Sequence, residues 1–207
     1  MSALPFPPVV AILRGVRPDE ILGVAEALVD AGLRMIEVPL NSPDPFDSVA
    51  RLAGKFGQAC LCGAGTVLSA ADVDRVRDAG GRLIVTPNTD ATVIARAVAL
   101  GLTVMPGFAT ASEAFQAIQA GAQSLKLFPA ASYGPGHLKA LRAVLPPDLP
   151  VYAVGGVGPA NMAEWRAAGA AGFGIGGELY RPGEAPAEVK RKASALMSAL
   201  AEAGFAE

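Results

Sequence analysis

The chain has 207 residues and a mass of 20.9 kDa, and 52% of its residues are hydrophobic while only 17% are charged. Such an apolar chain can offset by burial the entropy that it loses on folding, which excludes intrinsic disorder. The net charge of −2 gives no basic field for nucleic acid. The apolar runs are far shorter than the ~20 residues of a membrane-spanning helix, and the segment from Met1 to Pro8 lacks the positive region of a signal peptide.

Short apolar runs alternate along the chain with segments of helical periodicity. Continuous apolar runs are typical of parallel strands buried on both faces. Eight strands, each followed by a helix, predict an α/β protein with a (β/α)8 barrel fold, formed by residues 1–207 as one domain. The alternative, a doubly wound open sheet, usually has fewer units and a glycine-rich dinucleotide motif after its first strand, and no such motif stands there. The predicted strands are Val9–Leu13, Met35–Leu40, Cys60–Val67, Leu83–Thr86, Thr103–Met105, Ser124–Phe128, Val151–Val154 and Gly172–Ile175.

The first two strands carry charged candidates. The active site of a (β/α)8 barrel lies at the carboxyl ends of its strands. Arg14 follows the first strand and could hold a carboxylate, although it could also be an exposed loop residue. Glu37 stands alone in the second strand, with Ile36 and Val38 on the opposite face. We expect it to act as a general acid or base, or to pair with an interior cation.

The third strand contains both cysteines of the chain, Cys60 and Cys62. Strand alternation puts them on one face, which disfavours a disulfide between them. With one histidine in the chain there is no Cys/His zinc set, and we expect no metal site. We predict two reduced, buried thiols in a cytoplasmic protein. The strand ends in Gly63-Ala64-Gly65-Thr66, where the glycines allow close backbone approach and Thr66 offers a hydroxyl.

The sixth strand has a lysine, Lys126, in the middle of an apolar run. Leu125 and Leu127 should point toward the helices, so that Lys126 points into the barrel. Burial lowers the lysine pKa from its usual ~10.4, and a neutral amine attacks ketones to form a Schiff base. The alternative is a lysine held in a salt bridge. If Glu37 shares its cavity, that charge raises the pKa of Lys126 while burial lowers it, and the sequence leaves the balance open.

Glycine pairs follow the seventh and eighth strands, as Gly155-Gly156 and Gly176-Gly177. The loops after these strands of a (β/α)8 barrel commonly bind phosphate through backbone N–H groups. Either pair alone could be a simple turn, but matching pairs on adjacent strands favour a phosphate site. The final helix, from Ala187 to Ala203, has an apolar stripe that should pack on the outside of the barrel.

With these motifs the chain resembles, nearly end to end, the bacterial 2-keto-3-deoxy-6-phosphoaldonate aldolases. These are class I pyruvate aldolases with a (β/α)8 fold and a trimeric assembly. The most specific matching segments are Ala11-Ile12-Leu13-Arg14-Gly15, Ile36-Glu37-Val38, Gly63-Ala64-Gly65-Thr66-Val67, Pro106-Gly107, Lys126-Leu127-Phe128-Pro129 and Gly155-Gly156-Val157.

The resemblance implies that Lys126 forms the Schiff base and that Glu37 is the general acid/base. It implies a cytoplasmic homotrimer that needs no metal or organic cofactor. Its partners would be a phosphorylated 2-keto-3-deoxy sugar acid, pyruvate and glyceraldehyde 3-phosphate. The implied substrate-binding residues are Arg14 and Thr66 for the carboxylate, Gly155, Gly156, Gly176 and Gly177 for the phosphate, and Pro87, Phe128 and Val154.

The chain departs from the gluconate-type pattern at three places. The segment from Glu37 to Pro43 is Glu-Val-Pro-Leu-Asn-Ser-Pro, where many gluconate-type members have Glu-Val-Thr-Leu-Arg. Val154 stands where they have threonine, and Gly177 where serine is usual. The first segment looks like the galactonate-type branch, the 2-dehydro-3-deoxy-6-phosphogalactonate aldolases. The two substrates differ only in configuration at C4, so we expect cleavage of the galactonate epimer, with the gluconate epimer as the alternative.

Two further functions fit a phosphate-binding barrel. One is an isomerase or a transferase of the thiamin-phosphate type, and the other is a non-catalytic sugar-phosphate sensor. The fold alone excludes neither of them. Neither requires a lone lysine in the middle of the sixth strand, and this lysine favours the aldolase hypothesis.

Overall fold

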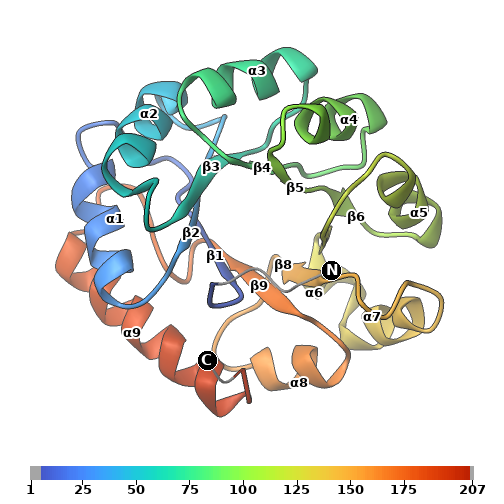
Figure 1. Ribbon diagram of the computed structural model, residues 1–207. Helices are drawn as coiled ribbons and strands as arrows, with labels where there is room; N and C mark the ends of the chain where they lie inside the picture. The colour runs from blue at the N-terminus through green and yellow to red at the C-terminus, as the bar shows by residue number, and fades with distance from the viewer. Residues whose placement is uncertain (1–5, 206–207) are drawn as a thin grey trace.

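The computed structural model describes residues 6–205 and shows strands alternating with helices along the chain (Figure 1). The strands are β1 (Val9–Ile12), β2 (Met35–Pro39), β3 (Leu61–Gly65), β4 (Leu83–Val85), β5 (Thr103–Met105), β6 (Gly107–Phe108), β7 (Leu125–Leu127), β8 (Val151–Val154) and β9 (Gly172–Ile175). The helices are α1 (Ile21–Asp30), α2 (Pro45–Phe56), α3 (Ala70–Asp78), α4 (Ala91–Ala99), α5 (Ala111–Gln119), α6 (Ala130–Tyr133), α7 (Pro135–Arg142), α8 (Met162–Ala167) and α9 (Pro186–Glu202).

The strands form one parallel sheet wound into a nearly closed barrel, with the helices around it, as predicted (Figure 1). Their order in the sheet is β5-β4-β3-β2-β1-β9-β8-β7-β6, and each adjacent pair is parallel. The first and last members of this order, β5 and β6, are neighbours in the sequence. The chain itself therefore connects the two edges of the sheet.

The predicted fifth strand, Thr103–Met105, is confirmed as β5, and a short strand that was not predicted, β6, follows it, so the sheet contains nine strands instead of eight. Pro106 separates β5 from β6, and proline has no N–H to give to a ladder. On one side of the break, β5 pairs with β4; on the other, β6 pairs with β7. The buried hydroxyl of Thr86, just after β4, accepts a hydrogen bond of 3.2 Å from Gly107 N. A side chain thus connects β4 to β6 where backbone pairing is interrupted.

Side chains alternate between two apolar cores. Residues on the outer face of the strands, such as Ile36, Val38, Leu125 and Leu127, pack against the helices. A smaller core fills the inside of the barrel and contains Val10, Ile12, Met35, Leu61, Leu83, Val85, Met105, Tyr152 and Val154. The alternation predicted for the second and sixth strands is confirmed, and it turns Glu37 and Lys126 inward.

Local signals set the helix boundaries. The side chain of Ser69 accepts a hydrogen bond from Asp72 N at the start of α3, and Thr110 and Glu113 form a capping box on α5. Asn161 is the N-cap residue of α8. The predicted apolar stripe on α9 is confirmed, and α9 packs beside α1 (Figure 1).

Both cysteines are buried and free, as predicted. Burial raises the pKa of the Cys62 thiol to about 12, so it stays protonated and unreactive. Among the helices that the structure describes, none is long and apolar enough to cross a membrane.

Ser48 carries a stability prediction. Its side chain on α2 is fully buried, and its hydroxyl has no hydrogen-bond partner among the described residues. A buried hydroxyl without a partner is costly, so Ser48→Ala should raise the free energy of unfolding by about 1 kcal/mol. Ser69→Ala, which removes the cap of α3, should lower it by about 1 kcal/mol. Urea unfolding of both variants measures the two effects, and a loss of stability in Ser48→Ala would contradict the prediction.

Candidate active site

Glu37 and Lys126 lie inside the barrel, each at the middle of its strand, on β2 (Met35–Pro39) and β7 (Leu125–Leu127). Glu37 is 2% exposed and Lys126 is 6% exposed. In the sheet order, β1, β9 and β8 lie between their strands, so the two side chains can approach each other only across the barrel interior. Lys126 Nζ lies 4.8 Å from the centre of the Phe128 ring, a cation–π distance.

Burial dominates the electrostatics of this pair. It lowers the pKa of Lys126, an effect that the Arg14 charge reinforces and the Glu37 charge opposes. The balance that the sequence left open therefore falls toward a neutral amine. Burial also raises the pKa of Glu37 to about 7, although Lys126 and Arg14 each pull it down. The site thus holds an amine that loses its proton readily and a carboxyl that exchanges one near neutral pH.

The Glu37 carboxylate has an unsatisfied oxygen and very little free space. Its Oε2 atom is buried without a hydrogen-bond partner among the described residues. A side chain at Gly65 on β3 would overlap this carboxylate. Thr66, the next residue, adopts a left-handed φ of 55°, an uncommon and strained conformation for a β-branched residue.

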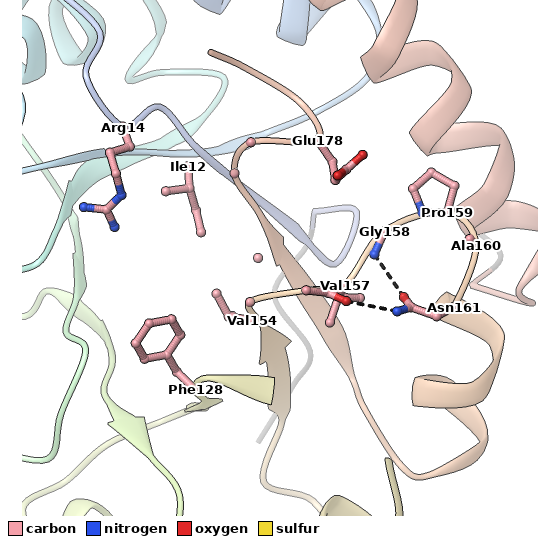
Figure 2. Close-up of a pocket in the computed structure, with 15 residues that line it drawn as sticks. Ile12, Arg14, Phe128, Val154, Val157, Gly158, Pro159, Ala160, Asn161 and Glu178 are labelled. Atoms are coloured by element: carbon pink, nitrogen blue, oxygen red, sulfur yellow. Dashed lines mark hydrogen bonds between the residues drawn. The ribbon is translucent and has the colours of Figure 1, made fainter. Parts of the chain in front are cut away.

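A cavity of about 480 Å³ opens beside this pair. Figure 2 shows Arg14 on one side of it, Asn161 on the other, and Phe128 and Val154 between them. Of the predicted substrate-binding residues, those that line the cavity are Arg14, Phe128, Val154, Gly155, Gly156, Gly176 and Gly177. Lys126, Glu37, Thr66 and Pro87 are not among its described lining residues. The Phe128 ring lines the cavity and also contacts Lys126, so it connects the two regions.

The glycine loops present backbone donors to this cavity. The N–H groups of Gly156, Val157, Gly177 and Glu178 donate to no acceptor among the residues that the structure describes. Gly155 and Gly156 have φ values of 95° and 74°, which only glycine adopts easily. Successive free N–H groups of this kind form an anion-binding surface.

Two asparagines hold the cavity walls, and sequence reasoning assigned neither of them a role. Asn161 Oδ1 accepts a hydrogen bond from Gly158 N and its Nδ2 donates to Gly156 O, both at 3.0 Å (Figure 2). Asn41 Oδ1 accepts a hydrogen bond of 2.6 Å from Arg14 Nη1. The signal for Asn161 was its position after Gly158-Pro159, where asparagine often caps a helix or closes a turn.

The fold and the site define an enzyme of the aldolase class, built on a (β/α)8 barrel. The chain belongs to the family of KDPG and KHG aldolases, whose model matches residues 2–188. It is 50% identical over 196 residues to the 2-dehydro-3-deoxy-6-phosphogalactonate aldolase of Escherichia coli K12, covering 95% of this chain and 96% of that protein.

Two solved structures are also similar. One is described as native KDPGal, with 49% identity, a TM-score of 0.94, and coverage of 98% of this chain and 97% of that one. The other is a KDPG aldolase from Legionella pneumophila with pyruvate captured at low pH as a covalent carbinolamine intermediate. It has 27% identity, a TM-score of 0.82, and coverage of 91% of this chain and 93% of that one.

The overlap at Gly65 predicts a steric loss of activity. Gly65→Ala should displace the Glu37 carboxylate and, if Glu37 is the general acid/base that the sequence predicts, reduce the rate of aldol cleavage by about 100-fold. The matched control is Gly54→Ala on α2, where an added methyl group meets nothing within 4 Å. That variant should keep wild-type activity. Equal rates in the two variants would show that the space at Gly65 is not needed.

The raised pKa of Glu37 predicts a pH-dependent stability change. Between its ordinary pKa of 4.5 and about 7, the folded state retains a proton that the unfolded chain has lost, so stability falls as pH rises through this window. Glu37→Gln removes this cost and should raise the free energy of unfolding by roughly 1–3 kcal/mol at pH 8, with little change at pH 4. Lys126→Met should show the opposite pH dependence. Burial lowers the pKa of Lys126, so the charged amine costs the wild type most at low pH, and the gain in the free energy of unfolding on its removal should be largest there. Urea unfolding at several pH values measures both slopes, and parallel slopes would contradict the assignment.

Proposed function

We propose that this protein is a class I aldolase that cleaves 2-dehydro-3-deoxy-6-phosphogalactonate to pyruvate and glyceraldehyde 3-phosphate. The observation that carries the proposal is the inward-facing, buried Lys126, whose pKa is lowered by burial and is also affected by the charges of Glu37 and Arg14. An amine whose pKa is lowered by burial, in the field of a carboxyl that titrates near pH 7, is suited to Schiff-base chemistry.

In the proposed reaction, the Lys126 amine attacks the C2 ketone, and loss of water gives an iminium ion. Glu37, directly or through a water molecule, removes the proton from the C4 hydroxyl. The C3–C4 bond then breaks, its electron pair moves into the iminium to form an enamine, and glyceraldehyde 3-phosphate leaves. The enamine takes up a proton at C3, and water hydrolyses the iminium to release pyruvate and restore the amine. The iminium accepts the electron pair, so the scheme needs no metal or organic cofactor.

The two ends of the substrate would bind at opposite walls. Arg14 and Thr66 would hold the carboxylate next to Lys126, because a guanidinium matches a carboxylate in shape and charge. The phosphate would bind the free N–H groups of the glycine loops. Phe128 and Val154 line the cavity between these walls. Pro87 would contribute from the end of β4, where it lies close to Gly107.

The preference for the galactonate epimer rests on two observations. The identity to the E. coli galactonate-type enzyme is 50%, against 27% to the KDPG aldolase of L. pneumophila. Val154, which replaces a hydroxyl donor, lines the cavity beside Gly155. Because one hydroxyl gives only modest discrimination between the two epimers, the gluconate epimer is the second substrate that we consider. A homotrimeric assembly and a cytoplasmic location stay predictions of the family resemblance.

Borohydride trapping tests the chemistry. Incubation of the wild type with pyruvate and borohydride should attach a reduced adduct to Lys126, visible by peptide mass. Lys126→Met should give no adduct and should lose cleavage activity almost entirely, since the nucleophile is gone. Full turnover by Lys126→Met would contradict the proposal. Loss of wild-type turnover on addition of a chelator would favour a metal-dependent transferase instead.

Initial rates on the two epimers test the substrate. The wild type should have the higher kcat/KM on the galactonate epimer. Val154→Thr replaces one methyl group by a hydroxyl in a side chain of the same shape. It should shift the ratio of the two kcat/KM values by about tenfold toward the gluconate epimer. Both rates are measured through pyruvate with a coupled lactate dehydrogenase. Binding of both epimers without turnover would identify a sensor instead of an enzyme.

A further inference from the structure

Arg14 is a long, exposed side chain on the loop after β1, and nothing in its own element fixes the guanidinium. A free arginine side chain loses about 2 kcal/mol of conformational entropy when it is ordered. If a substrate had to order it, that cost would be subtracted from binding. The orientation of Arg14 before the substrate arrives therefore affects affinity directly.

The loop after β2 provides this orientation. Asn41 Oδ1 accepts a charge-assisted hydrogen bond of 2.6 Å from Arg14 Nη1. At the next position, the Ser42 hydroxyl, 8% exposed, accepts a hydrogen bond of 2.9 Å from Gly15 N. Asn41 and Ser42 of the β2 loop thus hold Arg14 and Gly15 of the β1 loop. The β2 loop is itself fixed, because Leu40 N donates to Gly65 O at 2.8 Å and Ser42 N donates to Pro39 O at 2.9 Å.

The chemistry of the amide is as important as its position. An amide oxygen is uncharged, so it orients the guanidinium without cancelling its charge, whereas an aspartate there would form an ion pair. One hydrogen bond to Nη1 leaves four of the five guanidinium N–H groups for an anion. The retained charge acts on the catalytic pair as well, since Arg14 lowers the pKa of both Glu37 and Lys126.

We propose that Asn41 is a positioning residue that holds Arg14 at the edge of the cavity, oriented and still fully charged, to receive the carboxylate of the substrate. This inference rests on the proposed function, because it takes Arg14 to be the carboxylate-binding residue. Asn41 acts through Arg14 and has no role in the bond-breaking steps. It therefore affects the affinity for pyruvate more than the rate at saturation.

The test measures the pyruvate concentration that gives half-maximal borohydride trapping on Lys126. For Asn41→Ala this concentration should rise about tenfold, with the extent of trapping at saturating pyruvate within about twofold of wild type, as expected for the loss of one hydrogen bond to a charged group. The matched control is Gln58→Ala, which removes an exposed amide just beyond α2 and should behave like the wild type. Circular dichroism confirms that each variant is folded.

A second variant separates orientation from charge. Asn41→Asp keeps an acceptor for Arg14 but pairs its charge, so half-maximal trapping should require at least as much pyruvate as in Asn41→Ala. The pH of half-maximal trapping should also move upward, because a new carboxylate offsets the effect of Arg14 on the Lys126 amine. The charged and titratable groups that face this amine are Glu37 from β2, Arg14 from the β1 loop and Tyr152 from β8, whose pKa is raised to about 12 so that it stays neutral.

The outcomes are distinct. Wild-type half-saturation in both Asn41 variants, with normal trapping in the wild type, overturns the role of Asn41 and leaves the aldolase proposal intact. A second outcome concerns Asn41→Asp alone. If this variant needs the same pyruvate concentration for half-maximal trapping as the wild type and keeps the same pH profile, Asn41 only braces the loop, and the inference is overturned. Absence of any pyruvate adduct in the wild type overturns the proposed function, and the inference with it.

Discussion

The structure depends on keeping one amine and one carboxyl inside an apolar barrel. Transfer of either group from water to such an interior costs several kcal/mol in its charged form. Both groups respond by moving toward neutrality: the pKa of Lys126 falls and that of Glu37 rises to about 7. The surrounding fold supplies the stability that this arrangement lacks, through the large outer core between strands and helices.

The geometry of the barrel explains how residues far apart in the sequence act together. Glu37 and Lys126 stand on strands separated by three others in the sheet, so only the curvature of a barrel brings them to one space. Arg14 links the buried pair to the cavity. Its side chain lines the cavity, and its charge lowers the pKa of both Glu37 and Lys126. The glycine loops of β8 and β9 form the far wall (Figure 2). An elongated substrate with an anionic group at each end fits this division.

Strand alternation made much of this predictable. Leu125 and Leu127 on one face place Lys126 on the other, and the same argument places Glu37, because a parallel strand has only two faces. The glycine pairs were predictable from their matching positions after adjacent strands. The role of Asn41 was not predictable, since its hydrogen bond with Arg14 depends on the path of two loops that no periodicity describes. Nor could the sequence give the pKa of Lys126, because burial and the Arg14 charge lower it while the Glu37 charge raises it, and the balance depends on distances that only coordinates provide.

The break at Pro106 has a mechanical consequence. Around most of the barrel, backbone ladders join each strand to the next, but between β5 and β6 the ring is completed by the covalent chain and by the Thr86 hydroxyl. At this seam Gly107 is held by two side chains, because its N–H donates to the Thr86 hydroxyl and its carbonyl oxygen accepts a hydrogen bond of 2.7 Å from Thr89 Oγ1. The seam borders β7, since Gly107 is the register partner of Lys126 and Pro106 O accepts a hydrogen bond of 2.9 Å from Lys126 N. Lys126 thus lies beside the place in the described ring where side-chain hydroxyls, and no backbone ladder, connect one edge of the sheet to the other.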